Sequence, residues 1–282
     1  MSKAKVGPAR SGFAEVDGGK LWYEVAGQGP PLVLIHSGIT DSRSWDPQIA
    51  VFSQDFKVLR YDMRGFGQSD VTHGEYSARA DLLAVMDAAG IRVAALVGVS
   101  MGSSLAIDVA LEHPDRVSAL VVVGPGFSGR KQSDAFKALM RQVDQIFEEK
   151  GLDATIEREM EIWLYGKGRT AADVDPDVRA AVFAMDRFNS ERFPADMKAR
   201  PLEPPAVERL ADIRVPTLIV AGDRDLPDVM DAAEQLESGI KGARRLVMRG
   251  TAHVPNMEQP EVFNRIVLEF LDGAPKPKQS GR

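Results

Sequence analysis

Residues 98–102 have the sequence Gly-Val-Ser-Met-Gly, so that Ser100 stands between two glycines. An apolar run of strand length, Ala95–Ser100, leads into this pentapeptide, and a segment of helical period, Ser103–His113, follows it. Glycines on both sides allow a tight, strained turn that lifts a serine hydroxyl clear of a sheet. Since the Gly-x-Gly-x-x-Gly spacing is absent there, the pattern predicts a nucleophilic serine and not a dinucleotide-binding loop.

A serine hydroxyl is a poor nucleophile near neutral pH and needs a general base. The chain has four histidines. His36 ends an early predicted strand, His73 lies in a loop, and His113 ends a helix, where a capping role is favoured. His253 follows the last predicted strand, in a loop that can reach over the sheet edge. We therefore predict that His253 is the base for Ser100.

The base in turn needs a carboxylate that holds its tautomer and stabilises the imidazolium. Asp223 and Asp225 both follow the apolar strand Thr217–Ala221, in the sequence Gly-Asp-Arg-Asp. Either carboxylate could serve, and the alternative for both is a turn in which aspartates bond to the backbone. The residues alone leave the choice between the two open.

The candidate nucleophile, acid and base follow three different predicted strands. In an open parallel sheet, the carboxyl ends of the strands share one edge, where ligand sites form. The same edge offers donors for an oxyanion, namely the N–H of Met101, directly after Ser100, and the N–H of Gly38, after the strand Leu32–Ile35. The sequence thus predicts a complete acyl-transfer site at one edge of a sheet.

Strand-length apolar runs alternate with segments of helical period along most of the chain. The predicted strands are 32–36, 58–62, 95–100, 120–124, 215–222 and 245–248, and the predicted helices are 76–89, 103–113 and 260–271. The turn signal Asp-Gly-Gly at residues 17–19 indicates a hairpin near the N-terminus. This alternation predicts an α/β fold with a mostly parallel, doubly wound sheet and helices on both faces.

The alternation stops after residue 124 and resumes near residue 206. Apolar residues in between recur at helical spacing in three groups, at 136/140/143/147, at 156/160/163 and at 178/182/185. We therefore expect an α/β core of residues 1–126 and 206–282 and a helical cap of residues 127–205. Cap aromatics that face the serine would line a mostly apolar pocket, and Trp163 is the first candidate for substrate binding.

Composition narrows the class of protein further. The 282 residues are 44% hydrophobic and 27% charged, with a formal net charge of −6 and no dense basic cluster, which argues against nucleic-acid binding. The chain has no cysteine, and we expect neither a metal nor a cofactor. We found no apolar run of membrane-span length and no secretory signal, so we expect a cytoplasmic protein with loose ends at 1–10 and 273–282. Self-association stays open.

Five motifs in order resemble the α/β-hydrolase superfamily, and are most similar to its esterase, enol-lactone hydrolase and C–C bond hydrolase branch. They are His-Ser-Gly at 36–38, Asp-Met-Arg-Gly-Phe-Gly-Gln-Ser at 62–69, Gly-Val-Ser-Met-Gly at 98–102, Gly-Asp-Arg-Asp at 222–225, and His253 with Glu-Gln-Pro at 258–260. The resemblance covers about residues 12–125 and 206–271. Its order of serine, acid and histidine is that of the family.

The resemblance implies a role for several residues. Family spacing places the acid at Asp225, with Asp223 as the second candidate, and gives Asp62 and Arg64 a mainly architectural role. Ser37 stands where the family commonly has glycine, which leaves the shape of the oxyanion loop less defined than the nucleophile. A serine nucleophile disfavours the dehalogenase and epoxide-hydrolase branches, whose chemistry needs a carboxylate.

The function that follows is hydrolysis of a small carboxylic ester or lactone through an acyl-serine intermediate. Hydrolysis of a carbon–carbon bond in a diketone-like substrate is the alternative reaction that the same residues could run. A ligand-binding, receptor-like protein on a hydrolase scaffold is the alternative of a different class, because a fold alone never proves a function.

Overall fold

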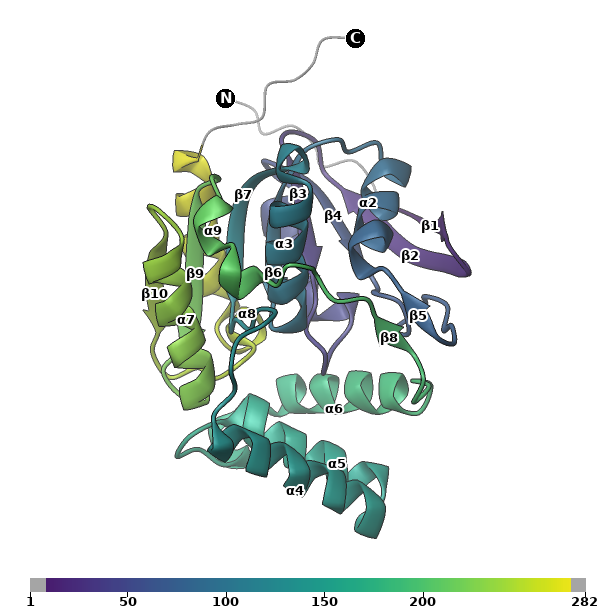
Figure 1. The fold of residues 1–282 in the computed structure, drawn as a ribbon, viewed down its shortest axis with the longest axis vertical. Coiled ribbons are helices and arrows are strands. Elements are labelled where there is room, and N and C mark those ends of the chain that lie inside the picture. The colour runs from purple at the N-terminus through teal and green to yellow at the C-terminus, as the bar shows by residue number, and fades with distance from the viewer. Residues whose placement is uncertain (1–8, 275–282) are drawn as a thin grey trace.

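An eight-stranded sheet runs through the middle of the protein and carries helices on both faces (Figure 1). The computed structural model describes residues 9–274. Nearly all of the two predicted loose ends lies outside the described residues. In spatial order the strands are β1 (Arg10–Val16), β2 (Gly19–Ala26), β4 (Lys57–Tyr61), β3 (Pro31–Ile35), β6 (Ala94–Val99), β7 (Val117–Val123), β9 (Thr217–Gly222) and β10 (Arg244–Met248).

Neighbouring strands from β4 to β10 pair in parallel, whereas β1 pairs with β2 and β2 with β4 in the antiparallel direction. The predicted hairpin is the β1–β2 pair, whose turn holds Gly18 at a φ of 76°. The predicted α/β fold with a mostly parallel sheet is therefore confirmed. Because parallel strands need crossover connections, each crossover between them carries helical structure over a sheet face.

Alternate side chains of the central strands pack into two separate hydrophobic cores, one on each face of the sheet. Val33 and Ile35 of β3 pack on the face covered by α2 (Ala78–Ala88), α3 (Met101–Glu112) and α7 (Pro227–Gly239). Leu32 and Leu34 pack on the opposite face, beneath α1 (Asp46–Phe52) and α9 (Pro260–Gly273). Burial of each such side chain contributes about 1.5–3 kcal/mol, so the central strands form a rigid platform for whatever follows their carboxyl ends.

Residues 127–205 leave the sheet and form a helical insertion. Its helices are α4 (Asp134–Lys150), α5 (Leu152–Glu159), a π-helical turn (Met160–Tyr165) and α6 (Pro176–Ser190). Figure 1 shows α4, α5 and α6 together beyond one end of the central strands. Asp175 precedes the first residue of α6, and its side chain accepts hydrogen bonds from the backbone N–H groups of Asp177 and Val178.

Several elements escaped the sequence patterns because they are short or weakly periodic. The insertion contains one strand, β8 (Lys198–Ala199), which pairs in parallel with β5 (Glu75–Tyr76) of the core, although no strand was expected there. Two residues per strand carry no readable alternation. The helices α1 and α7 were not predicted either, and α8 (Pro255–Glu258) is a single turn after the histidine loop.

Candidate active site

The turn between β6 and α3 holds Ser100 in a strained conformation. Its φ is 54° and its ψ is −111°, and it is the one non-glycine residue with positive φ in residues 9–274. Such a conformation costs about 1–3 kcal/mol and persists only where surrounding structure enforces it. The Ser100 N–H donates to the Val123 carbonyl of the neighbouring strand at 2.8 Å, which fixes the turn against the sheet.

The two glycines of the turn are required by close packing. A Cβ on Gly98 would lie 2.2 Å from the carbonyl oxygen of Gly102, and a Cβ on Gly102 would lie 2.4 Å from the carbonyl oxygen of Ile35. Ser103, fully buried behind the turn, accepts the Val123 N–H on its hydroxyl at 2.8 Å and lies 2.6 Å from the Gly98 carbonyl. The glycine pattern around Ser100 thus has a steric cause, as well as the conformational one inferred from sequence.

His253 and Asp225 form a buried pair at the ends of their loops. The His253 Nδ1 lies 2.8 Å from Asp225 Oδ2, and the two residues are only 4% and 3% exposed. The Leu226 N–H donates to the other carboxylate oxygen at 2.8 Å, which fixes the orientation of the carboxylate. With its Nδ1–H given to Asp225, the imidazole keeps Nε2 as a proton acceptor.

Asp223, the second candidate for the acid, has a different partner. Its Oδ1 accepts the Gly250 N–H at 2.7 Å and lies 3.5 Å from the Nε of Arg224. The carboxylate therefore ties the turn after β9 to the loop after β10, as an aspartate in a turn is expected to do. The geometry pairs His253 with Asp225 and gives Asp223 a structural contact.

The loop that carries His253 is held from both sides, by the insertion and by the short helix that follows the loop. Its backbone N–H donates to the Trp163 carbonyl at 3.0 Å, and the imidazole lies against the indole with 4.5 Å between ring centroids. Glu258 accepts the Ala252 N–H at 2.7 Å and pairs with Arg169 of the insertion at 2.6 Å. Burial raises the pKa of Glu258, and the Arg169 guanidinium opposes that rise.

Two cavities border Met101, the residue directly after Ser100. The smaller, about 370 Å³, is lined by Ser100, His253 and Trp163 among others, so the indole contributes to the wall beside the reacting groups. The larger, about 680 Å³, is lined by Gly38, by Met101 and by side chains of α4, α5 and α6. Both residues with a predicted oxyanion donor therefore border the larger cavity, which the inserted helices also line.

A comparison with known families decides what kind of protein this is. The sequence model of the Alpha/beta hydrolase family matches residues 32–266. The chain belongs to the α/β-hydrolase family.

Relatives of this α/β-hydrolase carry different substrate names. The chain is 28% identical to a 2-hydroxy-6-oxo-6-phenylhexa-2,4-dienoate hydrolase of Comamonas testosteroni, over 89% of this chain and 91% of that one. It is 27% identical to the carboxylesterase YbfK of Bacillus subtilis, over 88% and 82%. The crystal structure of the enol-lactonase from Burkholderia xenovorans LB400 aligns with a TM-score of 0.73 and 26% identity, over 93% of this chain and 100% of that one.

Two charged residues in the family motif at 62–69 organise the α/β-hydrolase core away from both cavities. Asp62 accepts the N–H groups of Ser42 at 2.9 Å and Gln68 at 2.8 Å. Arg64 donates two hydrogen bonds to Asp81, at 2.7 and 2.6 Å, and burial raises the pKa of that aspartate against the pull of the arginine. These contacts fit the architectural role that the resemblance implied.

Residues 9–274 contain no group of three or more His, Cys, Asp or Glu side chains placed to hold a metal ion. Within the same residues, no helix is both long enough and apolar enough to cross a bilayer.

Proposed function

We propose that this α/β-hydrolase cleaves a small carboxylic ester or lactone through an acyl-Ser100 intermediate. The observation that carries the proposal is the strained turn of Ser100 beside a cavity shared with His253, whose imidazole is paired with a buried Asp225. A strained serine and a tautomer-fixed imidazole at one sheet edge are the parts that acyl transfer needs.

In the acylation step, Ser100 Oγ attacks the carbonyl carbon while its proton passes to His253 Nε2. Asp225 stabilises the imidazolium that forms, because its carboxylate faces the Nδ1–H. The negative charge on the carbonyl oxygen is met by the backbone N–H groups of Met101 and Gly38. Met101 is the first residue of α3, so its N–H is outside the hydrogen-bond ladder of the helix and lies at the positive end of the helix dipole.

The tetrahedral intermediate collapses when His253 gives its proton to the leaving oxygen, which releases the alcohol, or opens the ring of a lactone. A water molecule then attacks the acyl carbon, with His253 again as the base, and Ser100 is regenerated. The Trp163 indole against the imidazole would shield this proton transfer from bulk solvent on one side.

Covalent labelling tests the nucleophile directly. A fluorophosphonate probe should attach once, at Ser100, and Ser100→Ala should abolish labelling and lower ester turnover by roughly 10⁴ to 10⁶. Labelling of a different serine, or full turnover by Ser100→Ala, would contradict the assignment. A panel of p-nitrophenyl esters and lactones would then rank the substrates.

The Comamonas relative favours one alternative, hydrolysis of a carbon–carbon bond. Its substrate name describes a ketone without an ester group, and the Ser100–His253–Asp225 group could add water to a ketone in the same way. Product analysis separates the two reactions, since an ester or lactone yields an acid and a hydroxyl group, whereas the alternative splits the carbon skeleton.

A further inference from the structure

Gly38, the second oxyanion donor of the proposed function, lies inside a turn that Thr40 closes. The Thr40 N–H donates to the Ser37 carbonyl at 3.4 Å. The Thr40 hydroxyl accepts the Ser37 N–H at 3.3 Å and lies 2.9 Å from the Ser37 hydroxyl. Because these contacts span Gly38, the position of Thr40 sets the direction in which the Gly38 N–H points.

The first residue of this turn is fixed by the core. His36 is fully buried, its Nδ1 lies 2.7 Å from the Ser37 carbonyl, and its Nε2 accepts the Met63 N–H at 3.0 Å. Burial lowers the pKa of His36, so the ring stays neutral and bonds through one donor and one acceptor. The hydrogen bonds of His36 therefore fix the Ser37 end of the turn, whereas the Thr40 end must be fixed by another group.

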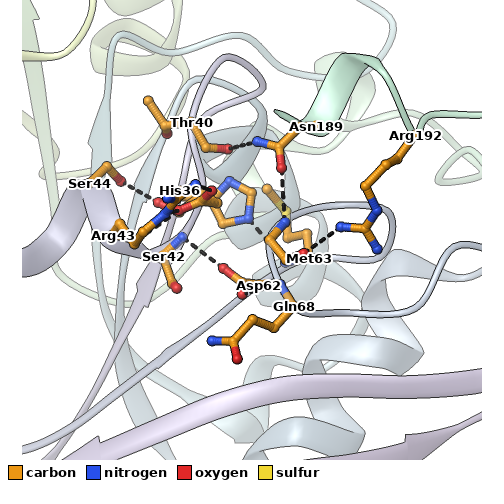
Figure 2. A network of polar contacts seen from close by, with 12 residues as sticks. His36, Thr40, Ser42, Arg43, Ser44, Asp62, Met63, Gln68, Asn189 and Arg192 are labelled. Atoms are coloured by element: carbon orange, nitrogen blue, oxygen red, sulfur yellow. Dashed lines mark hydrogen bonds and ion pairs between the residues drawn. The ribbon is translucent and has the colours of Figure 1, made fainter. Parts of the chain in front are cut away.

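Asn189, on the last turn of α6 in the helical insertion, is the group that contacts the Thr40 end (Figure 2). Its Nδ2 donates to the Thr40 carbonyl at 3.3 Å, and its Oδ1 accepts the Gly67 N–H at 2.9 Å. The residue is 1% exposed, so water does not replace either bond freely. A carbonyl on one side and an N–H on the other fix the orientation of the amide.

A second polar contact between the insertion and the core leaves the oxyanion turn untouched. Arg192, three residues further on, points toward the same core loop in Figure 2. It donates to the carbonyls of Gly67 and, at 3.1 Å, of Ser69. Asn189 and Arg192 thus hold the same core loop at 62–69, but only the Asn189 contact continues to Thr40. This difference makes Arg192 a matched control for general docking of the insertion.

We propose that Asn189 is a positioning residue for catalysis, which holds the Gly38 N–H in the direction of the oxyanion through Thr40. The inference rests on the proposed function, and it makes the oxyanion hole a joint property of the core and the insertion. Asn189 also borders the larger cavity beside Gly38, so a direct contact with substrate is the competing role that an experiment must separate.

The decisive variant is Asn189→Asp, which keeps an oxygen for the Gly67 N–H and turns the donor toward Thr40 into an acceptor. We expect kcat on the best p-nitrophenyl ester to fall about 10- to 100-fold with KM within twofold, a smaller loss than the roughly 10²–10³ for deletion of an oxyanion donor. Affinity for a trifluoromethyl ketone analogue, which forms a tetrahedral adduct, should fall by the same factor. Arg192→Gln should change kcat less than about twofold.

A rise in KM with unchanged kcat would assign Asn189 to substrate binding and overturn the proposal, as would equal losses in Asn189→Asp and Arg192→Gln. If Asn189→Asp fails to fold, Thr40→Val tests the same chain of contacts, because it removes the hydroxyl that closes the turn. An unchanged kcat in Thr40→Val would then overturn the proposal.

The rate of fluorophosphonate labelling at Ser100 separates this inference from the function on which it rests. Absence of labelling in the unmodified protein would refute the proposed function itself. Normal labelling that is equally fast in Asn189→Asp would refute only the positioning role, since the phosphonyl oxygen needs the same donors as the oxyanion.

Discussion

The sheet edge and the helical insertion differ in how deeply their side chains are buried. At the edge, Ser100 and Asp225 follow β6 and β9, whose side chains are all buried, and His253 follows β10 at the end of the sheet. Each of the three residues forms a hydrogen bond with backbone. In the insertion, Phe147 and Phe188 are 56% and 45% exposed, although both belong to amphipathic helices. Under the proposed function, the chemistry that needs fixed geometry would reside at the ends of the buried strands, and the exposed helices of the insertion would carry the surface that can vary with substrate.

The two regions also treat buried acids differently. Asp225 has a histidine and a backbone N–H as partners, whereas Asp186 on α6 faces Glu159 of α5, a second carboxylate. Burial, and then the charge of Glu159, raise the pKa of Asp186 to about 8, and burial also raises the pKa of Glu159. The buried acid at the edge thus has two hydrogen-bond partners, whereas the raised pKa of Asp186 keeps the buried acid of the insertion protonated near neutral pH.

The largest effect should come from separating the two aspartates of the edge. Asp225→Asn should lower turnover by about 10⁴, because the histidine would then be held in the wrong tautomer. Asp223→Asn keeps an oxygen for the Gly250 N–H but removes the negative charge beside Arg224, and it should lower turnover less than about tenfold, with its main effect on stability. Steady-state kinetics of both variants on one ester would identify the acid. A larger loss of turnover in Asp223→Asn than in Asp225→Asn would show that the acid is misassigned.

A second prediction concerns the acid pair of the insertion. An Asp whose pKa is raised to about 8 in the folded protein keeps its proton where the unfolded chain has lost it, so unfolding releases a proton and stability falls as the pH rises from about 4 to 8. Asp186→Asn removes this loss. The variant should therefore gain stability relative to the unmodified protein as the pH rises. The difference between their free energies of unfolding should grow by roughly 2–4 kcal/mol from pH 5 to pH 8.

Denaturant melts at several pH values would measure this change. Asp177→Asn is the matched control, because Asp177 lies exposed on the first turn of the same helix. It should stay within about 0.5 kcal/mol of the unmodified protein at each pH. A pH-independent difference for Asp186→Asn would mean that Asp186 is charged in the folded protein.

The smallest effect should appear where the two regions meet, at Trp163. Its indole borders the smaller cavity beside Ser100, and truncation to alanine should change the relative rates among acyl chain lengths by about tenfold between neighbouring members. Truncation of Phe188, which lines neither cavity, should leave the profile flat and serves as the comparison. If Trp163→Ala lowers the melting temperature and keeps the profile of the unmodified protein, the indole is packing and not a selector.

Sequence patterns predicted the sheet, its six parallel strands and the residues that the structure brings to one edge, because apolar runs of strand length and glycine-flanked turns are local signals. The choice of Asp225 over Asp223 came from family spacing and agrees with the geometry of the His253 pair. Whether these residues catalyse an ester hydrolysis stays a prediction for the kinetics above.

Contacts across long stretches of chain could not be predicted in the same way. Asn189 meets Gly67 across 122 residues and Thr40 across 149, and a lone asparagine at the end of a helix carries no spacing that reveals either partner. The pairing of Arg169 with Glu258 also joins two residues that are far apart in the sequence. Contacts of this kind can be identified only from the structure, because they depend on how the insertion packs against the loops of the core.

The π-helical turn at Met160–Tyr165 limits how this protein can be recombined with its relatives. Its Trp163 carbonyl accepts the backbone N–H of His253, so the main chain of the insertion and the loop of the proposed base share a hydrogen bond that no side-chain substitution can restore. A chimera that exchanged residues 127–205 as a block would import a foreign backbone at this point. Module boundaries drawn to spare residues 160–169 should give active hybrids, whereas boundaries at the ends of the insertion should misplace the imidazole.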